Sequence, residues 1–500
     1  MKTRLLPSIA AMLALVASTP FAFAQNSEIE ELKAMMRTMQ KTINEQNARI
    51  ATLENQKAGQ AEKPATSVAG KSPKGSKSMP GVAASDIDLS LVTPATATFS
   101  PKTSVVPDAD LLGDLQKAAP RVNNAVLDPE MKGYITIPGT ETIFKLGGSA
   151  RIDSIVDFGN NGNPNQFTPS TIPVRGEPGW DGGERTSMQA KATRLNFEIR
   201  RPVPYDSSLR IYYENDFYND STTNSMNYRV RHFYGQAWNF LIGQTYSAFQ
   251  DIDVFPDVVD YQGPNGIVNR RQPQIRYTYP VYDHGDSNFQ LFASVEQPDG
   301  KIDLENDSSS VDPVSVNHTP DGVAGFRLEG KPGHLKGAAL FRDLSYESDS
   351  GSNDGTFGWG LTLAGALNLL EKDKLSAQVT FGEGVSRYIN DLSGENLDAA
   401  YVDGRLEAIP VAAAMAGYSH QWSDQWRSTV AGGYVHADVP GSLGPFSVQD
   451  TVYGSVNLMW HPTSSFRMGL EYLYGFKETL DGSEADANRL NFVLRYDLVR

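Results

Sequence analysis

The sequence contains no cysteine among its 500 residues. This absence excludes a disulfide scaffold, a cysteine zinc site, a thiol nucleophile and the lipid-attachment cysteine of a lipoprotein. Long apolar runs are missing beyond the first two dozen residues, and the mean hydropathy is −0.38, which excludes a helical membrane protein. Positive charge is scarce, with 44 Lys and Arg against 59 Asp and Glu and a net charge of −15. A basic surface for nucleic acid is therefore not expected, and no nucleic-acid partner is predicted.

The first residues have the pattern of an export signal. Two basic residues precede an apolar segment, and small residues at Ala22 and Ala24 form a cleavage site. Residues 1–24 are therefore predicted to be a signal peptide, with the mature chain beginning at Gln25 and working outside the cytoplasm.

A heptad repeat follows the signal. Apolar side chains recur at the a and d positions of four heptads, which is the pattern of a coiled coil. These positions are Ile29, Leu32, Met36, Met39, Ile43, Gln46, Ile50 and Leu53, with Gln46 as the polar interruption. We therefore predict a self-associating helical stalk over residues 25–57, whose strand number the heptads leave open.

Residues 58–131 are rich in Ala, Pro, Ser, Thr, Lys and Gly. Such a composition cannot bury a core, so this segment is predicted to be an extended linker. Its first part is basic, which is compatible with contact to an anionic cell-wall polymer such as peptidoglycan. A solvated spacer is the simpler interpretation, and the sequence leaves this choice open.

The remaining chain, residues 132–500, alternates apolar and polar side chains in segments of about ten residues. In the final segment, Leu490 and Phe492 alternate with Asn491 and Arg495. A period of two with one wet face is the pattern of a half-buried strand. We count about sixteen such segments, so the predicted fold class is all-β.

Two architectures accommodate these strands: a soluble sandwich or propeller with its apolar parity inside, or a membrane barrel with that parity facing lipid. Charged residues of both signs recur on the polar parity, aromatic residues cluster at strand ends, and long connections alternate with short ones. Outer-membrane barrels combine short periplasmic turns with long outer loops. We therefore expect a transmembrane antiparallel β-barrel of about sixteen strands around an aqueous channel. The segment 228–244 is an exception, because neither of its parities is cleanly apolar.

Several segments resemble one protein family. Residues 133–153, beginning Gly-Tyr-Ile-Thr-Ile-Pro-Gly-Thr, and residues 243–251 and 260–277 are similar to DcaP-like trimeric porins of Gram-negative bacteria. The resemblance implies a homotrimer in the outer membrane, in contact with lipid and lipopolysaccharide, and a coiled coil in the periplasm. It also implies diffusion of small anionic solutes such as dicarboxylates. The chain departs from the family at Arg500, where members tend to end on an aromatic residue.

Arginines supply the candidate pore lining, mostly on the polar parity of the first strands. They are Arg194, Arg200, Arg210, Arg229, Arg231, Arg270, Arg271 and Arg276. A guanidinium stays charged and offers a planar fork of donors that matches a carboxylate. The alternative is that these arginines are structural and pair with acids. In trimeric porins the corresponding loop folds inward, so the resemblance places four aspartates at a constriction: Asp251, Asp253, Asp257 and Asp260.

Catalytic and metal-binding patterns are missing from the sequence. It has no HExxH motif, no His–Ser pair two residues apart for a barrel phospholipase, and no phosphate loop or cofactor fingerprint. We therefore expect no enzyme, no metal and no cofactor. Besides an anion channel, two functions remain open: a general or sugar-selective porin, and a structural tether joining the outer membrane to the cell wall through the coiled coil.

Overall fold

The computed structural model describes residues 134–205, 207–218, 225–284, 287–303, 314–347, 353–370 and 372–498. The predicted signal peptide, coiled coil and linker lie outside the described residues and stay predictions. Among the residues that are described, no helix has the length and apolar character needed to cross a membrane.

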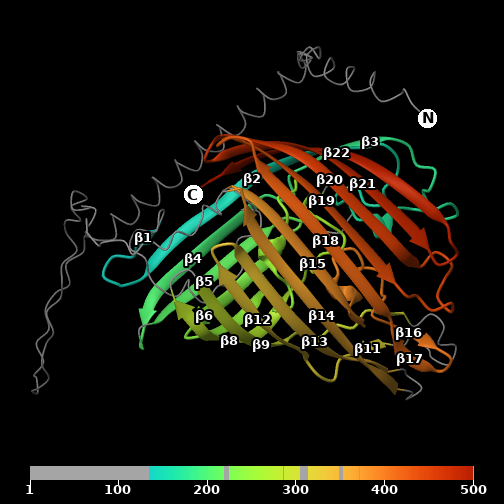
Figure 1. The fold of residues 1–500 in the computed structure, drawn as a ribbon, viewed down its shortest axis with the longest axis horizontal. Coiled ribbons are helices and arrows are strands. Elements are labelled where there is room, and N and C mark those ends of the chain that lie inside the picture. Colours follow the sequence, from blue (N-terminus) through green and yellow to red (C-terminus); the bar gives the residue numbers. More distant parts are fainter. Residues whose placement is uncertain are drawn as a thin grey trace, which may run out of the picture. The chain divides into compact units, whose positions relative to one another are not determined.

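Sixteen antiparallel strands form a closed barrel (Figure 1). The first eight are β2 (Ile143–Asp157), β4 (Arg194–Val203), β5 (Ser207–Asp216), β6 (Arg229–Ala237), β7 (Phe240–Tyr246), β8 (Arg271–His284), β9 (Ser287–Glu296) and β12 (Asp321–Gly330). The others are β13 (Gly333–Glu347), β14 (Asn353–Leu369), β15 (Asp373–Glu383), β18 (Pro410–Gln421), β19 (Trp426–Ala437), β20 (Val448–Thr463), β21 (Phe466–Thr479) and β22 (Glu484–Asp497). The last strand pairs with the first, with Ser149 opposite Asp497, and so closes the sheet. Closure leaves no free sheet edge along this ladder.

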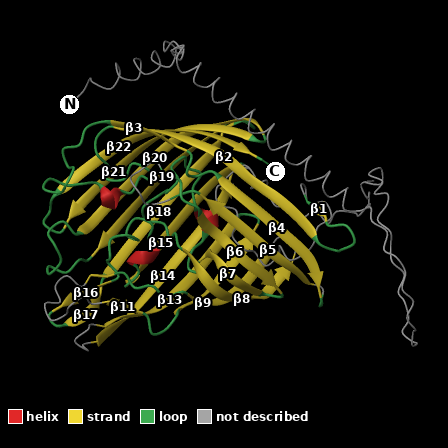
Figure 2. Ribbon diagram, turned by 180° about the vertical axis from the view of Figure 1, so that it is seen from behind, coloured by secondary structure: helices red, strands yellow, loops and turns green. Residues whose placement is uncertain are grey.

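Smaller elements complete the barrel. β3 (Arg185–Gln189) pairs with β2 beyond the point where β4 ends, and β1 (Ile135–Thr136) and β11 (Val314–Val316) add short pairings. β10 (Ile302–Asp303), β16 (Ala399–Val402) and β17 (Arg405–Ala408) form a separate three-stranded sheet. The short 3₁₀ helices, red in Figure 2, are η3 (Pro169–Thr171), η4 (Ile252–Val254) and η5 (Ser386–Tyr388).

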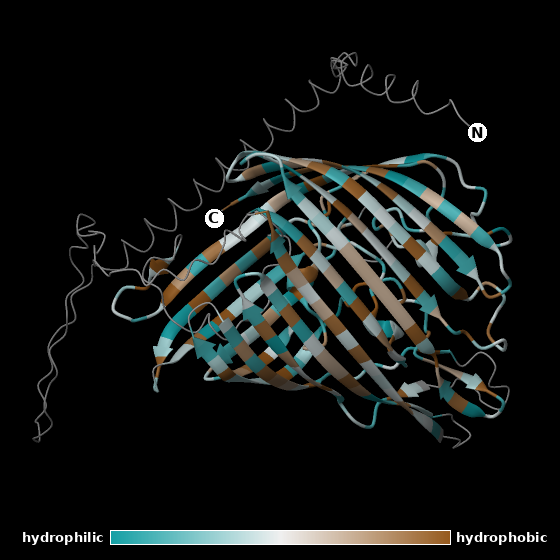
Figure 3. Ribbon diagram, in the orientation of Figure 1, coloured by the Kyte–Doolittle hydropathy of each residue, from teal (hydrophilic) through white to brown (hydrophobic). Residues whose placement is uncertain are grey.

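The two faces of the barrel wall have opposite chemistry, and their alternation is visible along each strand in Figure 3. On β22, Phe492 and Tyr496 are exposed on the outer face, whereas Arg489, Asn491 and Arg495 are buried on the inner face. Apolar side chains outside and polar side chains inside are the pattern of a membrane barrel. The predicted barrel is therefore confirmed over the soluble alternative.

Connections alternate in length around the barrel, as predicted. Short turns join β4 to β5 and β6 to β7, while long loops occupy the other end of the barrel. Four of these loops recur below: L1 (residues 158–184), L3 (247–270), L4 (297–320) and L6 (384–409).

The irregular segment 228–244 holds two strands and a bulge. Trp238 and Asn239 both have positive φ, 52° and 144°, and form the two-residue turn between β6 and β7. Such turns match the twist of the paired strands. On β6 the register shifts so that Arg231 is the extra residue between Val230 and His232. A bulge reverses the parity of the strand beyond it, which explains why no regular alternation is visible here.

Part of the lumen is a packed core. Inward-facing Val323 on β12 and Leu340 on β13 are buried against Phe249 of L3 and Ile389 of L6. Residue 268 of L3 also forms an antiparallel bridge with residue 389 of L6. A barrel of this size was expected to enclose water alone, but L3 and L6 fill the β12–β19 side of the lumen with apolar side chains.

The candidate pore lining

Loop L3 crosses the inside of the barrel. Its Asp251 contacts Arg327 on β12, its Asp257 contacts Arg427 on β19, and its Tyr261 contacts β6. A segment that touches strands all round a closed barrel must pass through the lumen. The inward fold implied by the family resemblance is thus present.

Asp251 and Asp253 bind one arginine. Arg327 Nη1 lies 3.0 Å from Asp251 Oδ1 and its Nη2 lies 2.6 Å from Asp253 Oδ2, while His334 Nε2 lies 2.8 Å from Asp251 Oδ2. Burial alone raises the pKa of Asp251, but Arg327 and His334 outweigh it and hold this pKa well below its usual range. Ligand atoms of Asp251, Asp253 and His334 lie within 4.8 Å of one another, a spacing compatible with a metal. Because both carboxylates already bind the guanidinium of Arg327, the arrangement fits a cluster of ion pairs better than a metal site.

Asp257 and Asp260 also face away from the predicted arginine lining. Asp257 forms a buried ion pair with Arg427. Asp260 Oδ2 accepts a 2.9 Å bond from the backbone N–H of Gly263, and its own N–H donates to Glu471 on β21. Burial raises the pKa of Asp260 to about 6. All four predicted aspartates therefore lie in the lumen, and the arginines that bind three of them, Arg327 and Arg427, are on β12 and β19.

Five of the predicted pore-lining arginines pair instead with carboxylates on β4 and β5. Arg200 and Arg210 both bind Glu198, with Arg210 Nε 2.7 Å from Oε1. Arg210 Nη1 also donates to the hydroxyl of Tyr234 at 2.8 Å.

The next pair of carboxylates lies on β5. Glu214 binds Arg231 at 2.6 Å and Arg194 at 3.4 Å. Asp216 binds Arg229 at 2.8 Å and Arg231 at 3.0 Å. Each carboxylate in this half of the lumen thus serves two arginines.

The last three predicted arginines differ from one another. Arg270 binds Asp299 of L4 at 3.3 Å and belongs to the loops rather than to the wall. Arg271 lies over the ring of Tyr246, 5.6 Å from its centroid. Arg276, on the inner face of β8, donates to the backbone carbonyl of Tyr246 at 2.6 Å.

The strands β4–β8 therefore carry a surplus of positive charge inside the barrel. These described strands carry seven of the predicted arginines, of which Arg271 and Arg276 form no ion pair within the described residues. The other five pair with three carboxylates that the sequence did not single out: Glu198, Glu214 and Asp216. The signal was available, because residues two apart on a strand share a face, and Glu198 precedes Arg200 by two positions. The pairing with acids that was the alternative interpretation is therefore present for five of these arginines, and their role in selectivity stays a prediction.

The comparisons with known proteins agree with this fold. The family model for the DcaP outer membrane protein matches residues 132–498. The chain belongs to this family. Its structure is similar to the outer membrane channel DcaP of Acinetobacter baumannii, with 22% sequence identity and a TM-score of 0.62, over 73% of this chain and 99% of that one.

Weaker similarities extend to two other solved structures. One is an anion-selective porin from Comamonas acidovorans, with 9% identity, a TM-score of 0.45 and coverage of 72% of this chain and 100% of that chain. The other is a Salmonella typhi OmpF complex with daunomycin, with 10% identity, a TM-score of 0.45 and coverage of 73% and 100%. No curated protein matches the chain. The DcaP family consists of outer membrane proteins, and the similar DcaP structure is an outer membrane channel, so this chain has an outer-membrane channel fold.

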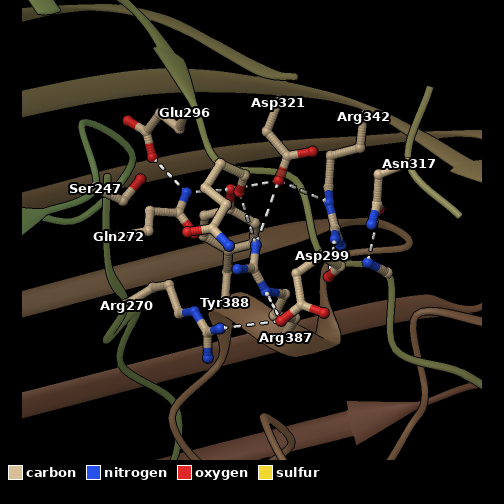
Figure 4. Close-up of polar contacts among 12 residues, drawn as sticks. Ser247, Arg270, Gln272, Glu296, Asp299, Asn317, Asp321, Arg342, Arg387 and Tyr388 are labelled. Atoms are coloured by element: carbon tan, nitrogen blue, oxygen red, sulfur yellow. Dashed lines mark hydrogen bonds and ion pairs between the residues drawn. The ribbon is translucent and has the colours of Figure 1, made fainter. Parts of the chain in front are cut away.

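Opposite the arginine-rich strands, the loops are joined by a second charge network (Figure 4). Arg342 on β13 lies 3.2 Å from Asp321 and 2.9 Å from Asp398 of L6. Arg387 of L6 lies 3.3 Å from Asp299 of L4, which also binds Arg270 of L3. The network therefore ties L3, L4 and L6 to the wall through three arginines and three aspartates.

Proposed function

We propose that this barrel allows passive diffusion of small anionic solutes, dicarboxylates in particular, along the arginine-rich half of its lumen. One observation carries the proposal: β4–β8 carry seven of the predicted arginines, of which five pair with the three carboxylates there and two form no ion pair within the described residues. Three aspartates of L3 pair with arginines on β12 and β19 instead. A guanidinium binds carboxylates through two parallel hydrogen bonds, so a surplus of guanidinium groups favours carboxylate solutes. Charged groups along a pore set the sign of the ions that it admits.

The acidic net charge of the whole chain does not oppose this proposal. Acids on exposed loops are screened by salt over a Debye length of about 8 Å. Charges inside a narrow, low-dielectric wall act with focused fields and lose less to screening. The local surplus of arginine should therefore outweigh the net charge of −15.

Selectivity measured across a planar bilayer tests the proposal. In a salt gradient the wild-type channel should give a zero-current potential of the anion-selective sign. Changing Arg194, Arg210 and Arg276 together to Gln should move this potential toward the cation value, because three of the seven charges are lost.

Three results would count against the proposal. Cation preference in the wild type would mean that Asp251, Asp253, Asp257 and Asp260 dominate the pathway. An unchanged potential in the triple variant would assign those three arginines to structure alone. The absence of any channel steps would favour the tether instead.

We further propose that the chain is a homotrimer whose N-terminal heptads and barrel walls both contribute to assembly. The exposed apolar outer face, which includes Leu146 and Ile152, would contact neighbouring subunits, lipid and lipopolysaccharide. Removing residues 27–57 should leave the barrel folded, because its strands close on one another. Cross-linking should then detect fewer trimers without abolishing them, and monomers alone would show that the stalk is the sole oligomeriser.

A further inference from the structure

Two cations on the inner wall, on β8 and β13, have no carboxylate of their own. Arg276 on β8 donates to Gln274 Oε1 and to the carbonyl of Tyr246, and Lys336 on β13 donates to the carbonyl of Gln250. Within the described part of the chain, neither cation forms an ion pair with an acid. Arg276 and Lys336 instead repel each other electrostatically.

The structure holds both cations in place with neutral groups. The two backbone acceptors, at positions 246 and 250, flank the point where L3 leaves the barrel wall. The ammonium of Lys336 also lies 5.0 Å from the centroid of the Phe292 ring. Carbonyl and ring contacts orient a cation without supplying a countercharge.

Acids nearby do not cancel this pair. Asp251 and Asp253 attract Lys336 at longer range, but their carboxylates bind Arg327. Glu296 attracts Arg276 and is itself engaged by Gln272 and by the N–H of residue 248. Lys336 is 7% exposed and Arg276 is half-buried, so the guanidinium is the more accessible of the two groups.

We propose that Arg276 and Lys336 form a discrete binding site for one carboxylate group of a permeating solute at the root of L3. This inference rests on the proposed anion pathway and adds to it a specific, saturable step. The guanidinium of Arg276 contacts the carboxylate, and the ammonium of Lys336 adds a second positive charge in a poorly hydrated wall, where Coulomb attraction is stronger than in water.

The experiment measures block of chloride current by succinate, added at rising concentration to single channels in a planar bilayer. Wild-type block should saturate. Lys336→Gln should raise the half-blocking concentration about tenfold, since one charge-assisted contribution of about 1.4 kcal/mol is lost, and Lys336→Arg should largely restore it. Arg276→Gln should weaken the block at least as much.

Lys374→Gln is the matched control. Lys374 is another inward lysine, on β15, and it donates to a backbone carbonyl of L3 at Asp253, 2.5 Å away. If loosening of L3 caused the effect, both lysine variants would weaken the block equally, and the proposal would be wrong. Anion selectivity without saturable block in the wild type would also overturn the site while leaving the proposed function intact. Wild-type cation selectivity would overturn the proposed function itself.

Discussion

The two halves of the lumen contain similar residues but balance their charges differently. Where L3, L4 and L6 meet β12 and β13, three arginines face three aspartates beside an apolar core. On β4–β8, five of the seven predicted arginines pair with three carboxylates and the other two form no ion pair within the described residues. Matched charges with apolar packing are suited to holding loops in place, whereas surplus charge of one sign is suited to attracting a solute.

The comparison also shows that pairing does not by itself make an arginine structural. Arg342 and Arg200 are both buried, at 2% and 5% exposure, and both bind carboxylates. They differ in what remains when they are removed. Without Arg342, Asp398 loses its ion-pair partner among the described residues while Asp321 keeps Arg387 at 3.5 Å, whereas without Arg200 the carboxylate of Glu198 keeps Arg210.

The largest effect is expected for Arg342→Gln. This change weakens the pairing of both Asp321 and Asp398 inside the barrel, and breaking a buried pair from one side costs about 3–5 kcal/mol. We expect the barrel in lipid vesicles to unfold at a clearly lower urea concentration, with unfolding measured by tryptophan fluorescence. Arg185→Gln serves as control, because the Arg185 side chain is 38% exposed and its pair with Asp157 should contribute about 1 kcal/mol at most. Equal losses in the two variants would refute the structural role of the loop network.

An intermediate effect is expected from pH, through a contact between L6 and L1. Asp391 of L6 accepts bonds from the N–H of Ser170 at 3.2 Å and from Thr451 Oγ1 at 2.6 Å. Glu395 accepts from Ser170 Oγ at 3.0 Å. The neighbouring charged groups are Glu177 and Lys477, which bind each other. Both L6 carboxyls are therefore held by neutral donors.

Burial raises the pKa of Asp391 to about 6 and that of Glu395 to about 7. In the native contact these two carboxyls keep their protons up to about pH 6 to 7, whereas in a released loop they lose them above pH ~4. The contact between L6 and L1 is therefore most stable in acid, and its stability falls as the pH rises to about 7. Protection of L6 amides against hydrogen exchange, corrected for the intrinsic pH dependence, should drop about tenfold from pH 5 to 8. The double change of Asp391→Asn with Glu395→Gln should flatten this pH profile. The control is Glu484→Gln, at an exposed position at the start of β22, which should leave the profile unchanged. A rise in protection with pH would contradict the assignment.

Much of the fold follows from the sequence, because a period of two is a local property. The parity of β22 and the alternation of long and short connections were predicted from this pattern, and the inward path of L3 was implied by the family resemblance. The segment around Arg231 was not, since a one-residue bulge reverses parity without changing composition. The packed core around Phe249 was also missed, because it forms between loops and strands far apart in the chain.

The candidate site was predicted only in part, because local patterns identify residues but not their partners in the fold. Charge and parity identified the arginines, but pairing depends on which strands are neighbours and in what register. Glu214 and Arg231 meet across the β5–β6 ladder, and Lys336 reaches L3 from a strand 60 residues beyond Arg276. Such contacts are set by the closed barrel rather than by local spacing.

The smallest effect is expected for Arg200→Gln, and it sharpens the comparison most. Arg200 is buried like Arg342, and the substitution is the same, yet Glu198 still binds Arg210 at 2.7 Å after the change. Removing one cation from a surplus also relieves repulsion among the others. We therefore expect the free energy of unfolding, taken from the urea midpoint, to change by no more than about 1 kcal/mol, because the substitution leaves no buried charge without a partner. A loss as large as that of Arg342→Gln would mean that the arginine-rich half is built for stability, and the distinction between the two halves of the lumen would fail.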